Sequence, residues 1–195
     1  MYNTKTAVVN TGSSYIEAGI NDNIILKEVN VKKSPTNKDF IEFIFEDENG
    51  KVATMTEWKN EKNMWIKTDE DLQRRDDLQF GRILQIISCY LETIPEATFD
   101  SFSGMINWAK TTLDNIQEKE KQPLRLKVVY DKNNYTKVST NGIFVEPMSV
   151  GTSQIKKLSR DNFERQVVAD VETQSAPFSS SNETISVSGA DDLPF

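Results

Sequence analysis

Histidine is absent from all 195 residues of the chain, and there is only one cysteine. Without histidine the chain cannot use His-based general-base catalysis, a His-containing triad or most zinc sites. The lone thiol, Cys89, cannot form an internal disulfide, and its apolar helical surroundings predict that it is buried. We therefore expect no structural zinc site.

Long apolar runs are absent as well. No stretch approaches the about 20 apolar residues that a membrane-spanning helix needs, and residues 1–12 lack the basic-then-apolar order of a signal peptide. Apolar residues make up 37% of the chain and charged residues 27%, which is typical of a soluble protein. The expected location is the cytoplasm, with no membrane partner.

Positive charge is missing from the C-terminal end. No Lys or Arg follows Arg165, whereas five acidic residues do, and removing them from the net charge of −7 leaves −2 for residues 1–165. A body close to neutral can still carry a basic groove, so the overall acidity does not exclude binding to nucleic acid.

Alternation of apolar and polar residues predicts strands, and a spacing of three and four residues predicts helices. The predicted strands are 25–33, 40–46, 51–59, 124–130, 135–140 and 143–145. The predicted helices are about 69–94, ended by Pro95, and about 101–119, ended before Pro123. This order of three strands, a helical segment and two or three strands is that of an oligonucleotide-binding (OB) fold.

We therefore predict a β-rich α+β protein with an OB-fold-like, five-stranded Greek-key barrel. A two-helix insertion, about 69–121, separates strands three and four. The predicted organisation is an N-terminal arm (1–20), the OB domain (21–149), a flexible and largely disordered tether (150–190) and an acidic tip (191–195).

The tip has the residues of a portable ligand. Pro194 restricts the backbone, and Phe195 offers an apolar ring beside its own carboxylate. Asp191 and Asp192 add attraction toward a basic surface, and Leu193 adds apolar contact. Asp-Asp-Leu-Pro-Phe at the C-terminus resembles the acidic tip of bacterial and phage single-stranded-DNA-binding proteins.

This resemblance implies a protein that binds and protects single-stranded DNA during replication, recombination and repair, without strong sequence preference. It implies a role without catalysis, metal or cofactor. It also implies that the tip recruits enzymes such as a polymerase, helicase, primase or nuclease, and it leaves a homo-oligomer possible. The helical insertion is larger than in bacterial members, and the tether lacks their usual Gly, Pro and Gln. These departures favour a divergent phage protein, which would act in the host cytoplasm.

A site for single strands needs cations along the backbone path and flat rings on which bases stack. Tryptophan often packs in a core, so each Trp is equally suited to either role, and each lysine taken alone suits a solvated surface. Phe43 and Phe45 are assigned to the core. The candidate DNA contacts are Lys32, Lys33, Phe40, Trp58, Lys59, Lys62, Trp65, Lys127, Lys132, Tyr135 and Lys137.

Other functions fit the same pattern. A recombination mediator or strand-annealing protein would share the tail, and an OB-fold adaptor would bind protein instead of DNA. A carboxylate-based nuclease is disfavoured, because the acids near Asp69 and Asp76 suit the solvated start of a helix.

Overall fold

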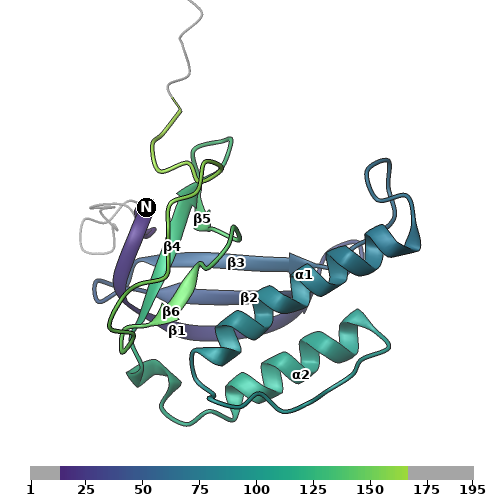
Figure 1. The fold of residues 1–195 in the computed structure, drawn as a ribbon, viewed down its shortest axis with the longest axis horizontal. Coiled ribbons are helices and arrows are strands. Elements are labelled where there is room, and N and C mark those ends of the chain that lie inside the picture. The colour runs from purple at the N-terminus through teal and green to yellow at the C-terminus, as the bar shows by residue number, and fades with distance from the viewer. Residues whose placement is uncertain (1–13, 167–195) are drawn as a thin grey trace, which may run out of the picture.

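The computed structural model describes residues 14–166, so residues 191–195 of the predicted tip lie outside the described part of the chain. Within that part the fold is β-rich α+β, with six antiparallel strands and two α-helices (Figure 1). The strands are β1 (Gly19–Lys33), β2 (Asp39–Glu46), β3 (Val52–Trp58), β4 (Leu124–Tyr130), β5 (Thr136–Val138) and β6 (Val145–Pro147). The helices are α1 (Asp69–Ser88), α2 (Phe102–Asp114) and the short 3-10 helix η1 (Lys119–Lys121).

Strand β1 organises the sheet, whose order is β3-β2-β1-β4-β5 with β6 also paired to β4. Its second half pairs with β2, and this pairing has a register shift between Leu26 and Glu28. Its first half pairs with β4. No ladder joins β3 to β5 within residues 14–166, so the sheet is open and a closed barrel is not confirmed. The predicted order of strands and helices along the chain is confirmed.

The core lies between the sheet and the two helices, which cover the same face in Figure 1. Along β2, Ile41, Phe43 and Phe45 are buried toward the helices, as predicted, whereas Phe40 and Glu42 face the other way. Alternate residues of a strand point to opposite faces, so the pattern of β2 determines which face receives the helices. The residues that α1 and α2 bury against it are mainly aliphatic: Ile83, Ile86, Ile87, Met105, Ile106, Ala109 and Leu113.

Both helices end earlier than the apolar spacing predicts. Helix α1 starts at a capping box formed by Thr68 and Asp71, and it ends at Ser88 instead of about residue 94. The apolar residues beyond its end still pack on the core, because the chain turns back after Cys89. Cys89 is buried as predicted, and burial raises the pKa of its thiol to about 12. Helix α2 ends at Asp114 instead of about residue 119.

The segment after β6 is folded onto the sheet, which corrects the predicted start of the tether at residue 150. The backbone N–H of Tyr130 in β4 donates to the carbonyl of Asn162 at 2.8 Å, and Ile155 and Asp161 are buried. Residues 153–166 form neither a helix nor a strand. The folded body therefore extends well beyond residue 149, and the remaining residues of the predicted tether lie outside the described part.

Candidate nucleic-acid interface

A row of three candidate residues crosses the face of the sheet that the helices leave uncovered. The strand register places Lys32 of β1 opposite Phe40 of β2, and Phe40 opposite Trp58 of β3. The rings of Phe40 and Trp58 are stacked, with centroids 4.3 Å apart and an angle of 28° between their planes. Trp58 is 44% exposed, so part of its ring remains open to solvent, with Phe40 between it and Lys32.

A buried polar network sets the position of Trp58. Glu57, the preceding residue, points toward the helices, where Arg82 of α1 binds it through Nε at 2.5 Å and Nη2 at 2.7 Å. The amide of Gln79 donates to Glu57 Oε2 at 2.9 Å and to the carbonyl of Trp58 at 2.8 Å. A bidentate arginine–carboxylate pair has a defined geometry, so this end of β3 is held firmly while Trp58 faces away from α1.

Three of the candidate lysines are paired with acidic side chains. Lys32 contacts Glu42 at 2.5 Å, and Lys33 contacts Asp39 at 2.9 Å. Lys62, in the loop after β3, contacts Asp69 at 2.6 Å. Exposed pairs of this kind contribute only about 0–1 kcal/mol, so a phosphate could displace the acid at modest cost.

The turn between β4 and β5 presents Tyr135, which is 70% exposed as predicted. Asp131 builds the turn, because its carboxylate accepts from the backbone N–H of Tyr135 at 2.9 Å and of Asn133 at 2.8 Å. These two bonds hold the pKa of Asp131 below its ordinary value, the Tyr135 bond most strongly. Lys132 and Lys137 are exposed, and neither forms an ion pair within residues 14–166.

The loop after β3 presents Trp65, which is 80% exposed. Asn63 shapes the loop: its side-chain oxygen accepts from the N–H of Trp65 at 2.8 Å and of Ile66 at 3.1 Å. Ile66 is buried and anchors the loop, whereas Met64 is exposed beside Trp65. Met64 was not among the predicted contacts, because the residues around it form no periodic pattern from which its exposure could be predicted. Lys59, at the base of this loop, is exposed.

The prediction that Lys127 contacts DNA is wrong for this conformation, because its side chain is completely buried. Its ammonium donates to Asp161 at 2.7 Å and to the carbonyls of Asn141 and Lys156 at 2.8 and 3.0 Å. The alternation of β4 predicted a solvent-facing side chain at this position. Residues 153–163 cover that face, so all three donor directions of the lysine are used within the protein.

Asp161, the partner of Lys127, accepts four hydrogen bonds in this buried site. They come from Lys127, the N–H of Leu158, Ser139 and Asn141, at 2.7, 2.8, 2.8 and 3.0 Å. Burial by itself raises the pKa of this carboxyl, but the hydrogen bonds outweigh it and lower the pKa to about 2. Sequence reasoning missed Asp161, because it placed the residue in the tether.

The candidates therefore fall into separate groups. The structure brings Lys32, Phe40 and Trp58 together, whereas Lys33, the next residue of β1, is opposite Asp39 and belongs to the other face of the sheet. Among the described residues, neither Trp65 nor Tyr135 makes a ring contact with Trp58, so these rings stand on separate loops.

The described part of the chain was also compared with the requirements of a metal site and of a membrane-spanning helix. Within residues 14–166 no three Cys, Asp or Glu side chains gather as ligands for a metal ion. None of the helices described there has the length and apolarity to cross a membrane. Comparison of the chain with models of known protein families and with curated proteins found no match.

Proposed function

We propose that this protein binds single-stranded DNA without strong sequence preference and protects it during replication, recombination and repair. The observation that carries the proposal is the stacked pair of Phe40 and Trp58 beside Lys32 on the uncovered face of the sheet. A base can stack on the open ring surface while a lysine neutralises the adjacent phosphate. Such binding tolerates any sequence, because every base has a π-face.

The proposal extends to an OB-like body. In OB folds, oligonucleotides lie across strands two and three and between the loops that follow strands one and four. Phe40 and Trp58 are on β2 and β3, and Tyr135 is in the turn after β4. The sharing of β1 between two halves of the sheet supports the same assignment.

The energies are sufficient for useful affinity. Each stacked base contributes about 1–3 kcal/mol to the binding free energy. Stacking on two or three rings would therefore supply much of that free energy, and only a few lysines would need to contribute. Lys59, Lys132 and Lys137 form no ion pair within residues 14–166 and would add a salt-dependent component. The protein would melt DNA hairpins by mass action, since it binds only the unpaired state.

Recruitment of replication or recombination enzymes is assigned to residues 191–195, on the strength of their sequence. Deleting these five residues is expected to abolish binding to such an enzyme and to leave DNA affinity unchanged or raised. Loss of DNA binding in this variant would contradict that division of labour. A pull-down and a DNA titration with the same preparations measure both effects.

The decisive test is tryptophan fluorescence during titration with oligo-dT at low and high salt. Trp65 and Trp108 are changed to Phe, so that Trp58 is the only reporter. We expect strong quenching and an affinity that falls as salt rises. The matched control, Trp58→Phe with the other two tryptophans intact, reports any signal from elsewhere.

Each other outcome points to a different function. Salt-dependent binding in a gel shift without quenching of Trp58 would keep the function and reject this row as its site. No binding at either salt concentration would favour a protein-binding adaptor. Rapid pairing of complementary strands in an annealing assay would favour a recombination mediator.

A further inference from the structure

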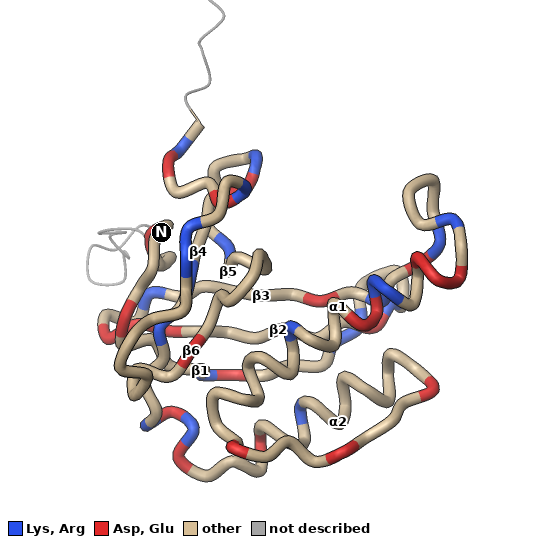
Figure 2. Tube along the Cα trace, viewed as in Figure 1, with Lys and Arg blue, Asp and Glu red and all other residues tan. Residues whose placement is uncertain are grey.

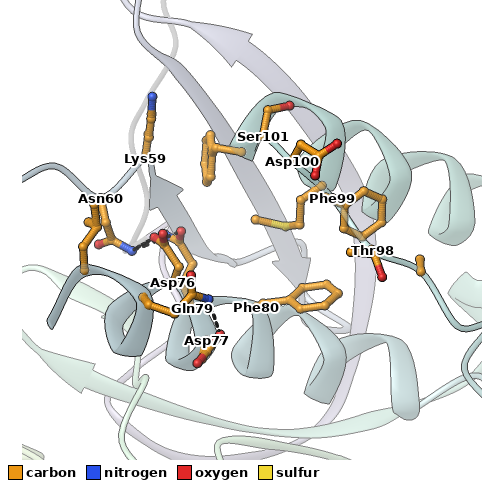
Figure 3. Close-up of a pocket in the computed structure, with 15 residues that line it drawn as sticks. Lys59, Asn60, Asp76, Asp77, Gln79, Phe80, Thr98, Phe99, Asp100 and Ser101 are labelled. Atoms are coloured by element: carbon orange, nitrogen blue, oxygen red, sulfur yellow. Dashed lines mark hydrogen bonds between the residues drawn. The ribbon is translucent and has the colours of Figure 1, made fainter. Parts of the chain in front are cut away.

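A groove with an apolar floor separates α1 from the beginning of α2, on the helical side of the protein (Figure 3). Its volume is about 470 Å³. Leu72, Phe80, Phe99, Phe102 and Met105 provide the apolar lining. The rings of Phe80 and Phe99 meet edge to face at 5.9 Å, so the floor is made of packed aromatic side chains that still reach the surface.

Carboxylates dominate the rim of this groove, which we call the acidic groove. Asp76 and Asp77 lie on one side and Asp100 lies on the other, and Lys59 is the one basic residue that the described part of the chain adds to the lining (Figure 3). None of these three carboxylates forms an ion pair within residues 14–166. The rim therefore repels a nucleic-acid backbone and attracts cations that flank an apolar side chain.

A surface with the complementary chemistry is present at the other end of the same protein. Lys156 and Arg160 are exposed, and neither is in an ion pair within residues 14–166. Leu158 lies between them in sequence and is exposed, as is Ile143, and both line a shared hollow with Lys156. We call these four residues the basic patch.

The two surfaces cannot meet within one molecule. The acidic groove lies toward the end where α1 and α2 begin, whereas residues 153–166 run along β4 at the opposite end (Figure 1). Figure 2 shows acidic positions of α1 and of the segment before α2 at the former end. Contact between two unlike surfaces at opposite ends joins molecules head to tail.

We infer that the acidic groove binds the basic patch of a second copy of this chain. Leu158 of one copy enters the aromatic floor of the next, and Lys156 and Arg160 approach Asp77 and Asp100. The contact is open, so it extends to chains of copies as concentration rises. It is separable from the proposed binding to DNA, because Asp77, Asp100, Lys156, Leu158 and Arg160 are not assigned to that site, although Lys59 in the groove lining is also a candidate DNA contact.

Exposed charge pairs are weak and screened by salt. We therefore expect an association that depends on concentration and is lost in high salt. Sedimentation velocity of the full chain at several concentrations, in low and high salt and without DNA, measures it. A sedimentation coefficient that stays constant as concentration rises in low salt would overturn the inference, and would leave the DNA titration as a separate question.

Two charge-reversal variants localise the contact. Asp77→Lys/Asp100→Lys alters the acidic groove and leaves the hydrogen bond between Asp76 and Asn60 intact. Lys156→Glu/Arg160→Glu alters the basic patch and leaves Lys157 over the ring of Phe163. Each variant alone should lower the association constant by about tenfold or more. The control Glu92→Lys/Glu120→Lys makes the same charge change as the groove variant at two exposed residues outside both surfaces, and should not weaken association.

Mixing the two variants gives the sharpest result. One variant keeps an intact basic patch and the other keeps an intact acidic groove, so the mixture should associate although neither variant does so alone. Failure of the mixture to associate would overturn the pairing of these surfaces. Circular dichroism checks that each variant is folded, and if one is not, the other still tests the contact. Loss of DNA affinity without loss of association in Lys156→Glu/Arg160→Glu would reassign the basic patch to DNA.

Discussion

Two lysines on neighbouring strands of this protein lie in opposite environments. Lys32 of β1 is exposed at 49% of its side chain and has one acidic partner, Glu42. Lys127 of β4 is completely buried and is bound by Asp161 and two carbonyls. Both were among the predicted DNA contacts, as cations that could follow the backbone of a single strand.

The difference arises from what covers each face of the sheet. Residues 153–163 fold over the outer side of β4 and bury Lys127, whereas within residues 14–166 the helices leave the Lys32 face uncovered. A buried cation that is fully hydrogen-bonded holds structure together, and an exposed cation in a weak pair remains available to a ligand. Burial, and not residue type, therefore decides the role of a lysine here.

The largest effect is expected for Lys127→Met. This change leaves the carboxylate of Asp161 buried without its counter-charge, which should lower the free energy of unfolding by about 3–5 kcal/mol. Urea unfolding measures it. The matched change at an exposed residue, Lys132→Met, should alter stability by less than about 0.5 kcal/mol. Equal stability of the two variants would show that the ion pair does not hold the 153–163 segment.

A smaller effect concerns pH. The pKa of Asp161 is lowered to about 2 from an ordinary value near 3.8, so its stabilising contribution is complete above about pH 4 and is lost as pH falls toward 2. The contribution is about 2 kcal/mol. Urea unfolding as a function of pH should show wild type more stable than Asp161→Asn at pH 6, with the difference shrinking between pH 4 and 2. If the difference in unfolding free energy between wild type and Asp161→Asn stayed constant with pH, the loss of stability in the variant would be due to packing and not to charge.

On the uncovered face, Trp58→Ala should weaken binding to oligo-dT. The loss of one stacking surface lowers binding free energy by about 1–3 kcal/mol, which is roughly 5- to 150-fold in affinity. Fluorescence anisotropy of a labelled oligonucleotide measures it. Leu78→Ala, which removes an exposed apolar side chain from α1, is the control and should leave affinity unchanged. A change of equal size in both variants would remove Trp58 from the site.

The smallest effect is expected for Lys132→Ala/Lys137→Ala in and beside the β4–β5 turn. If these lysines contact phosphates, each loss should reduce the slope of log affinity against log salt by about 0.7. Lys121→Ala in η1 removes an exposed lysine away from this turn and should not change the slope. An unchanged slope in the double variant would restrict the site to the row of Lys32, Phe40 and Trp58.

Much of the fold could be read from local pattern. Alternation located β2 and β3 within about two residues and assigned Phe43 and Phe45 to the core, because those strands have one buried and one solvated face. The helix ends were less accurate, since apolar residues such as Leu91 and Ile94 reach the core from a turn as well as from a helix. The exposure of Tyr135 followed from its polar neighbours.

The candidate site was only partly predictable. Phe40 and Trp58 were both candidates, but their stacking depends on the register of β2 against β3, which no local pattern specifies. The network of Glu57, Gln79 and Arg82 joins residues more than 20 positions apart, so it has no signal in sequence spacing.

Composition and local pattern were enough to give the order of strands and helices, the absence of histidine and the Asp-Asp-Leu-Pro-Phe segment at 191–195. These are properties of composition and of short periodic stretches, which depend on neighbours along the chain. Three other features became apparent only in the folded protein: Lys127 is buried, residues 153–166 belong to the folded body, and Lys32, Phe40 and Trp58 form one row. Those outcomes depend on contacts between residues far apart in the chain, because a strand cannot specify which of its faces another segment will cover.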